Sequence, residues 1–107
     1  MVKYRLTPAA KNDLLEIWQY TIKAWGHKRA KQYLFDIETK LELLAMKPEL
    51  GRVRPEINHN YFSFPASSHI IYYLKAGDYI QIIAILHQRM DIERRLNRCD
   101  GGLDRLL

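Results

Sequence analysis

The sequence predicts an α+β domain in which a helical hairpin packs on one face of a mainly antiparallel sheet. The expected order is β-α-α-β-β-β, followed by a short final helix. Two observations carry this prediction. Apolar residues recur at helical spacing on both sides of Gly26 in the first half of the chain. The second half holds short runs rich in Ile, Tyr and Phe, which favour strands.

The first 26 residues are expected to form a strand and then a helix. Apolar and polar residues alternate from Val2 to Leu6, as in a half-buried strand. Thr7 suits an N-cap and Pro8 suits the first helical position. Gly26 can end this helix in a left-handed conformation. The apolar stripe between these signals consists of Ala10, Leu14, Ile17, Trp18, Thr21 and Trp25.

A second helix is expected from about Lys28 to Met46, and the short break before it predicts an antiparallel hairpin. Lys47 and Pro48 end it, because the residue before a proline avoids the helical region. The inner face of this helix would carry Ala30, Tyr33, Leu34, Ile37, Leu41 and Leu44.

Three strands and a helical turn are expected in the second half. The strands are Tyr61 to Phe64, Ser68 to Lys75 and Tyr79 to His87, the last two joined by a three-residue loop with Gly77 at its tip. A helical turn from about Asp91 to Asn97 would end the domain at residue 98, leaving residues 99–107 as a tail. We expect at least four strands, with the first paired in the sheet. The expected buried positions include Trp18, Ile37, Leu41, Tyr72 and Ile82.

The last two strands are apolar on both faces. In the final strand, one set is expected to face one way (Ile80, Ile82, Ala84 and Leu86) and another the opposite way (Ile83 and Ile85). The preceding strand splits in the same manner, with Ile70, Tyr72 and Leu74 against Ile71 and Tyr73. Because one layer of helices covers one face of a sheet, the second apolar face must be covered by the chain's own loops and tail or by a partner. The short chain has little polypeptide to spare, which favours a partner.

Composition limits the classes of function. A chain of 107 residues forms one domain, and a single cysteine, Cys99, excludes an internal disulfide and fits a reducing compartment. No signal peptide or membrane helix is recognisable, so a cytoplasmic location is expected. The four histidines are scattered, and there is no phosphate-binding glycine loop, so neither a metal nor a cofactor is expected.

The net charge of +5 is spread along the chain. Residues 1–26 carry four cations and two anions, residues 27–51 five and four, and residues 52–107 eight and six. This distribution favours a solvated, mildly basic surface over a track that binds phosphates. Sequence-specific binding to nucleic acid is therefore not expected.

Two histidines near the ends of the last strands are a candidate catalytic pair. With a three-residue loop, His69 lies opposite Ile85 and His87 opposite Ser67, which puts the two histidines ~7–8 Å apart on a diagonal. Arg89 follows on the same side. These groups could perform acid–base chemistry on RNA. The favoured interpretation is that both histidines are strand-end residues bonded to neighbouring backbone.

Four arginines, Arg89, Arg94, Arg95 and Arg98, crowd ten residues near the C-terminus. Acidic residues four positions away can neutralise some of them as ordinary ion pairs on a helix surface. The others leave a candidate edge for binding a target.

Several stretches of the chain resemble the ParE toxins of the RelE/ParE superfamily. They are Leu6 to Ala10 leading into the first helix, Pro48 with Gly51-Arg52, His69 to Tyr73, and Ile85 to Asp91. The resemblance extends from about Tyr4 to Leu96. It implies a RelE-like fold, a cognate antitoxin similar to ParD, and DNA gyrase as the target of a toxin that inhibits by binding.

RelE-type relatives imply an alternative function, ribosome-dependent cleavage of mRNA, here by His69, His87 and Arg89. Those relatives use an arginine where this chain has His69, and often a C-terminal tyrosine, whereas no tyrosine follows Tyr79. These departures favour the gyrase inhibitor over the ribonuclease. A degenerate toxin that only binds an antitoxin is the third hypothesis.

Overall fold

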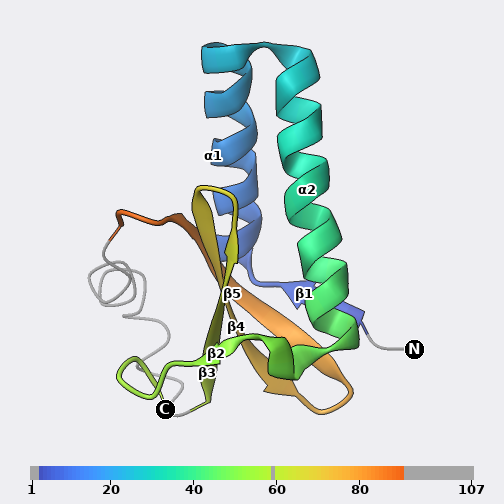
Figure 1. Cartoon of the computed structure of the whole chain (residues 1–107), viewed down its shortest axis with the longest axis vertical. Helices are drawn as coiled ribbons and strands as arrows, with labels where there is room; N and C mark the ends of the chain where they lie inside the picture. The colour runs from blue at the N-terminus through green and yellow to red at the C-terminus, as the bar shows by residue number, and fades with distance from the viewer. Residues whose placement is uncertain (1–2, 59, 91–107) are drawn as a thin grey trace.

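The structure is a computed structural model, and the description covers residues 3–58 and 60–90. The described elements follow the expected order (Figure 1). They are β1 (Lys3–Leu6), α1 (Pro8–Trp25), α2 (His27–Met46), the short 3-10 helix η1 (Pro48–Leu50), β2 (Arg52–Val53), β3 (Tyr61–Ala66), β4 (His69–Ala76) and β5 (Tyr79–His87). The expected final helix from Asp91 to Asn97 and the tail at residues 99–107 lie outside the described residues.

The five strands form one sheet in the order β1-β5-β4-β3-β2. β1 runs parallel to β5 and forms one edge, and every other pair is antiparallel. The sheet thus has at least four strands and includes the first one, as predicted. β2 was not expected, because two paired residues are too short to show a period in the sequence.

Local signals set the limits of the two helices. Thr7 caps α1 by accepting a hydrogen bond from the Ala10 N–H at 3.1 Å, and Pro8 occupies the first turn. Gly26, at φ 93°, ends α1, and α2 begins at the next residue. This one-residue connection makes the pair antiparallel, and both helices lie on the same side of the sheet (Figure 1).

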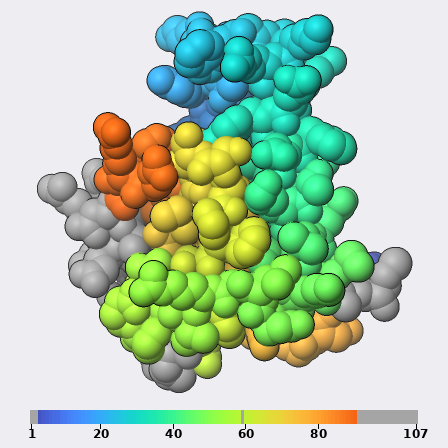
Figure 2. Space-filling view, viewed as in Figure 1, coloured from blue at the N-terminus to red at the C-terminus, as the bar shows by residue number. Residues whose placement is uncertain are grey.

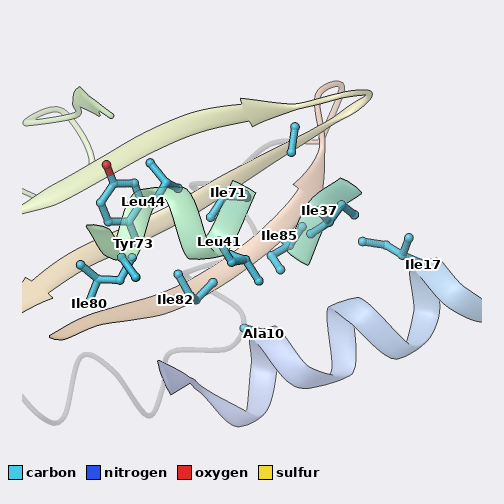
Figure 3. Packing of buried hydrophobic residues seen from close by; sticks show 12 residues of the cluster. Ala10, Ile17, Ile37, Leu41, Leu44, Ile71, Tyr73, Ile80, Ile82 and Ile85 are labelled. Atoms are coloured by element: carbon cyan, nitrogen blue, oxygen red, sulfur yellow. The ribbon is translucent and has the colours of Figure 1, made fainter. Parts of the chain in front are cut away.

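The main core lies between the hairpin and the sheet (Figure 3). Ile37 and Leu41 of α2 and Ile82 of β5 are buried there, as predicted. Trp18 is only half-buried, so that prediction was wrong. Its indole lies edge-on against the His27 ring at 5.2 Å and lines a groove beside the hairpin instead of entering the core.

The pairing of β4 with β5 differs from the predicted register in two places. Ala76 pairs with Tyr79, so the turn has two residues rather than three. Farther along, Tyr73 pairs with Ile82 but Tyr72 pairs with Ala84, which leaves Ile83 as an extra residue in a bulge. The shorter turn and the bulge each shift the pairing by one residue. Beyond the bulge, odd-numbered residues of β4 therefore again pair with odd-numbered residues of β5, as predicted.

The bulge changes which side chains of β5 share a face. Ile80 and Ile82 face the hairpin, whereas Ala84 and Leu86 lie on the opposite face with Tyr72. The prediction that these four β5 residues share one face was therefore wrong, because a period of two does not continue through a bulge.

Two side chains from the start of α1 support the bulged part of β5. The Thr7 hydroxyl donates to the Ile83 carbonyl at 3.2 Å, and the Asp13 carboxylate accepts from the Ile85 N–H at 3.0 Å. Both β5 groups are thereby satisfied where the strand ladder is interrupted.

The second face of the sheet is not left open at its centre. Tyr72, Ala84 and Leu86 are buried there, and Ile57 from the segment between β2 and β3 packs against them. The favoured prediction, that a partner covers this face, was therefore wrong for these residues, and the alternative, coverage by the chain itself, holds for them. Neither α1 nor α2 contains a stretch apolar enough to span a bilayer.

Candidate functional site

The two candidate histidines meet at one end of the sheet. His69 begins β4 and His87 ends β5, and the two residues are direct cross-strand partners. Their ring centroids lie 5.5 Å apart in a T-shaped arrangement. The prediction that they share a face is confirmed, but the contact is direct instead of diagonal because of the shorter turn and the bulge.

Tyr33 of α2 completes this group. Its hydroxyl lies 2.6 Å from Nδ1 of His69 and also accepts the Ser68 N–H at 3.2 Å. Burial and the neighbouring His87 lower the pKa of His69 to about 4, so this ring is neutral at pH 7. The helical spacing placed Tyr33 on the inner face of α2, but no signal in the sequence linked it to His69.

The histidine pair lines a cavity of about 310 Å³ that also has an acidic wall. Asp13 and Glu16 of α1 line it together with Tyr20 and Met90. Glu16 is exposed, and its carboxylate repels the negative charge of a phosphodiester, whereas Asp13 is buried and accepts the Ile85 N–H. The cavity therefore suits neutral or cationic groups better than RNA.

Arg89, the third member of the candidate catalytic group, is exposed just beyond β5 and does not line this cavity. Its backbone N–H donates to Nδ1 of His87 at 3.2 Å. The sequence favoured histidines at strand ends that bond to neighbouring backbone, and His87 makes such a bond. The other three arginines of the candidate target-binding edge, Arg94, Arg95 and Arg98, lie outside the described residues.

A second candidate site is a groove of about 350 Å³ where the hairpin meets the edge strand β1; we call it the hairpin groove. Its apolar lining comes from three elements, and Lys31 and Glu38 contribute charge at its rim. Burial, then Glu38 and Glu42, raise the pKa of the Tyr4 phenol, so it stays a neutral hydrogen-bond donor. The lining residues are Tyr4, Leu6, Leu14, Trp18, Leu34, Phe35, Ile37 and Leu41.

The hairpin groove exposes surface that a soluble domain normally buries. Phe35 is 69% exposed, and Trp18 and Leu34 remain partly accessible. Beside them, β1 is hydrogen-bonded to β5 on one side and forms the edge of the sheet on the other. An apolar groove next to a sheet edge can accept either an amphipathic helix or an added strand.

Metal chemistry has no support in the described structure. Within residues 3–58 and 60–90, no three His, Cys, Asp or Glu side chains are arranged so that they could hold a metal ion.

Residues 4–92 match the family model described as ParE toxin of type II toxin-antitoxin system, parDE. Toxin ParE1 of Mycobacterium tuberculosis is 39% identical over 95 residues, covering 88% of this chain and 97% of that protein. Toxin ParE1 of Caulobacter vibrioides is 32% identical over 96 residues, covering 90% and 99%.

A solved structure, titled "Chromosomal ParDE TA system from P. aeruginosa", matches with a TM-score of 0.71. The match covers 81% of this chain and 96% of that one at 21% identity, and therefore supports the fold. The family model and the curated relatives extend over nearly the whole described domain. The chain belongs to the ParE family of toxins of type II toxin–antitoxin systems.

Proposed function

We propose that this chain is a toxin that inhibits DNA gyrase by binding it, and that a cognate antitoxin similar to ParD neutralises the toxin. Family membership supports the pairing of toxin and antitoxin. The observation that carries the antitoxin site is the exposed apolar hairpin groove beside β1.

The antitoxin is expected to bind the hairpin groove with an extended or helical segment. The alternative surface, the second face of the sheet, is already buried around Tyr72 and Leu86. The groove exposes Phe35 and half-buries Trp18, two aromatic side chains of the kind that anchor interfaces. A segment that is disordered when free and folds on this groove could cover it without a preformed partner domain.

A gyrase inhibitor that works by binding needs a surface that favours one conformational state of the enzyme, and it needs no catalytic group. The features of the histidine cavity support this choice over the ribonuclease alternative. The pKa of His69 is lowered to about 4, which makes this ring a weak base, and the Glu16 carboxylate lines the same cavity. We assign target binding to Arg89, Arg94, Arg95 and Arg98.

The antitoxin site is tested by placing a charge in the groove. Phe35→Glu should weaken binding of the purified antitoxin by about 10- to 100-fold, since burying one large apolar side chain contributes ~1.5–3 kcal/mol. Met46→Glu is the matched control, because Met46 is 67% exposed, lies on the same helix and does not line the groove. Equal affinities of the two variants, measured by calorimetry, would exclude the hairpin groove as the antitoxin site.

Target binding is tested by a supercoiling assay with purified gyrase and, separately, by mRNA cleavage on ribosomes. The wild-type toxin should inhibit supercoiling, and replacing Arg94, Arg95 and Arg98 together by alanine should weaken inhibition while antitoxin binding persists. Ribosome-dependent cleavage that His87→Ala abolishes, with gyrase unaffected by the wild-type toxin, would overturn the proposal in favour of the ribonuclease.

A further inference from the structure

The helical hairpin ends in a tip that projects past the sheet (Figures 1 and 2). We use "hairpin tip" for residues 23–31, the last turn of α1, Gly26 and the start of α2. Every residue from Lys23 to Arg29 is exposed, so this run contributes nothing to the core.

The hairpin tip carries four cations in a stretch of the chain that has no acidic residue. Lys23, Lys28, Arg29 and Lys31 lie between Glu16 and Asp36 with no acidic residue among them. Their summed charge of +4 nearly equals the net charge of +5 of the whole chain. Within the described part of the chain, none of these four cations has a carboxylate oxygen within 4.0 Å.

The helix dipoles do not neutralise this charge. Lys23 lies in the last turn of α1, where a cation is favourable. Lys28 and Arg29, however, lie in the first turn of α2, which has no acidic residue and no side-chain cap. Cations at the positive end of a helix are unfavourable unless an anion is bound there. The tip therefore has a local arrangement that an external anion would stabilise.

An exposed aromatic ring lies beside two of these cations, Lys28 and Arg29. Trp25 is 64% exposed, and the Arg29 guanidinium carbon lies 5.3 Å from its ring centroid. Trp25, Lys28, Arg29 and Gln32 line an open hollow of about 340 Å³. An edge contact between the rings of Trp18 and His27 joins α1 to the first residue of α2. The hollow thus offers a flat ring, cations and an amide on one small surface.

We propose that the hairpin tip binds single-stranded nucleic acid, with the phosphates on its cations and one unpaired base stacked on Trp25. An acidic protein surface could satisfy the cations, but a single strand sets an unpaired, flat base beside each phosphate and so matches both the cations and the indole. A duplex satisfies the cations as well but keeps its base faces stacked inside. Cations around an exposed aromatic side chain are the combination with which proteins bind single strands without sequence preference.

The binding is tested with the purified full-length toxin and a labelled thymidine 20-mer, without gyrase or antitoxin, so its outcome is independent of the proposed target. Fluorescence anisotropy should show binding whose log–log salt slope is about −2 to −3, since each neutralised phosphate of a single strand contributes ~0.7. Trp25→Ala should lower the affinity by about 5- to 100-fold, and Trp25→Phe should keep most of it.

Charge variants separate the tip from general basicity. The tip variant replaces Lys23, Lys28, Arg29 and Lys31 by glutamine. The matched control replaces four exposed cations elsewhere, Lys11, Lys47, Arg52 and Lys75, and has the same net charge. Only the tip variant should lose binding and flatten the salt slope, and circular dichroism should show that both variants keep their fold.

Three results would overturn the proposal. One is the absence of binding to the thymidine 20-mer, and another is an equal loss of affinity in the tip and control variants. The third is that polyglutamate or a 20-base-pair duplex competes as strongly as the unlabelled single strand, while Trp25→Ala keeps full affinity. That last pattern would identify the tip as a site for an acidic protein or for duplex phosphates.

Discussion

Position 51 requires a glycine because a neighbouring side chain leaves no room for a Cβ, and not because of its backbone conformation. It follows η1 with φ −71°, a conformation that any residue adopts. A Cβ built at this position would overlap Oη of Tyr73 and lie 2.7 Å from Cζ of the same ring. Tyr73 is fully buried, stacks on Phe62 and donates a 2.6 Å hydrogen bond to the Pro48 carbonyl. The ring therefore cannot move away without breaking contacts.

Gly51→Ala should lower the free energy of unfolding by about 2–4 kcal/mol. Overpacking a filled core costs ~1–3 kcal/mol, and a displaced Tyr73 hydroxyl loses a hydrogen bond worth ~1 kcal/mol. For a domain of this size the melting temperature should fall by roughly 10–20 °C. Urea denaturation followed by circular dichroism measures the first quantity, and a thermal scan measures the second.

A double-mutant cycle tests the cause of this loss. Tyr73→Phe alone should cost about 1–2 kcal/mol, because the Pro48 carbonyl loses its donor. In the Gly51→Ala background it should cost less, since it removes the atom that the new methyl group overlaps. Costs that add to within ~0.5 kcal/mol would refute the steric explanation. Gly77→Ala is the control, because nothing lies within 4 Å of its Cβ position and only its φ of 70° is penalised, by ~1–2 kcal/mol.

Three further predictions concern the same fold. Thr7→Ala should destabilise by about 1–2 kcal/mol in urea denaturation, more than Thr7→Ser, because it removes both the cap of α1 and the bond to Ile83. Asp13→Ala should cost about 1–3 kcal/mol by leaving the Ile85 N–H without its acceptor, and Asp13→Asn should recover part of that loss. Folding lowers the pKa of His69 from 6.5 to about 4, so as the pH falls this ring is protonated in the unfolded chain before it is protonated in the folded one. The free energy of unfolding should therefore fall as the pH drops from 6.5 to about 4. Solvent screening of the half-exposed ring should limit this loss to ~1 kcal/mol, and His69→Gln should flatten the measured pH dependence.

The sequence by itself determined the elements whose causes are local. A threonine followed by proline begins α1 and Gly26 ends it, because caps and backbone freedom depend on a few neighbouring residues. The period of the apolar residues likewise identified Ile37 and Leu41 as core positions. The family resemblance followed from short motifs of the same local kind and was confirmed by the family model.

The register of β4 against β5 could not be predicted from local sequence. The loop at Gly77 could hold two or three residues, and each choice gives a different register. The bulge at Ile83 depends on Thr7 and Asp13, which bind β5 from 76 and 72 residues away in the chain. No window of the sequence contains both partners, so the face of each β5 side chain was not predictable.

The surfaces were decided by the tertiary structure for the same reason. The charge counts along the sequence place Lys23 in one segment and Lys28 with Arg29 in the next, although the predicted turn at Gly26 already brings the three to one tip. Trp18 belongs to the apolar stripe of α1, but it is half-buried because it lines the hairpin groove. Burial and electrostatic potential depend on distances in space between residues far apart in the chain, and only the packing of hairpin on sheet sets those distances.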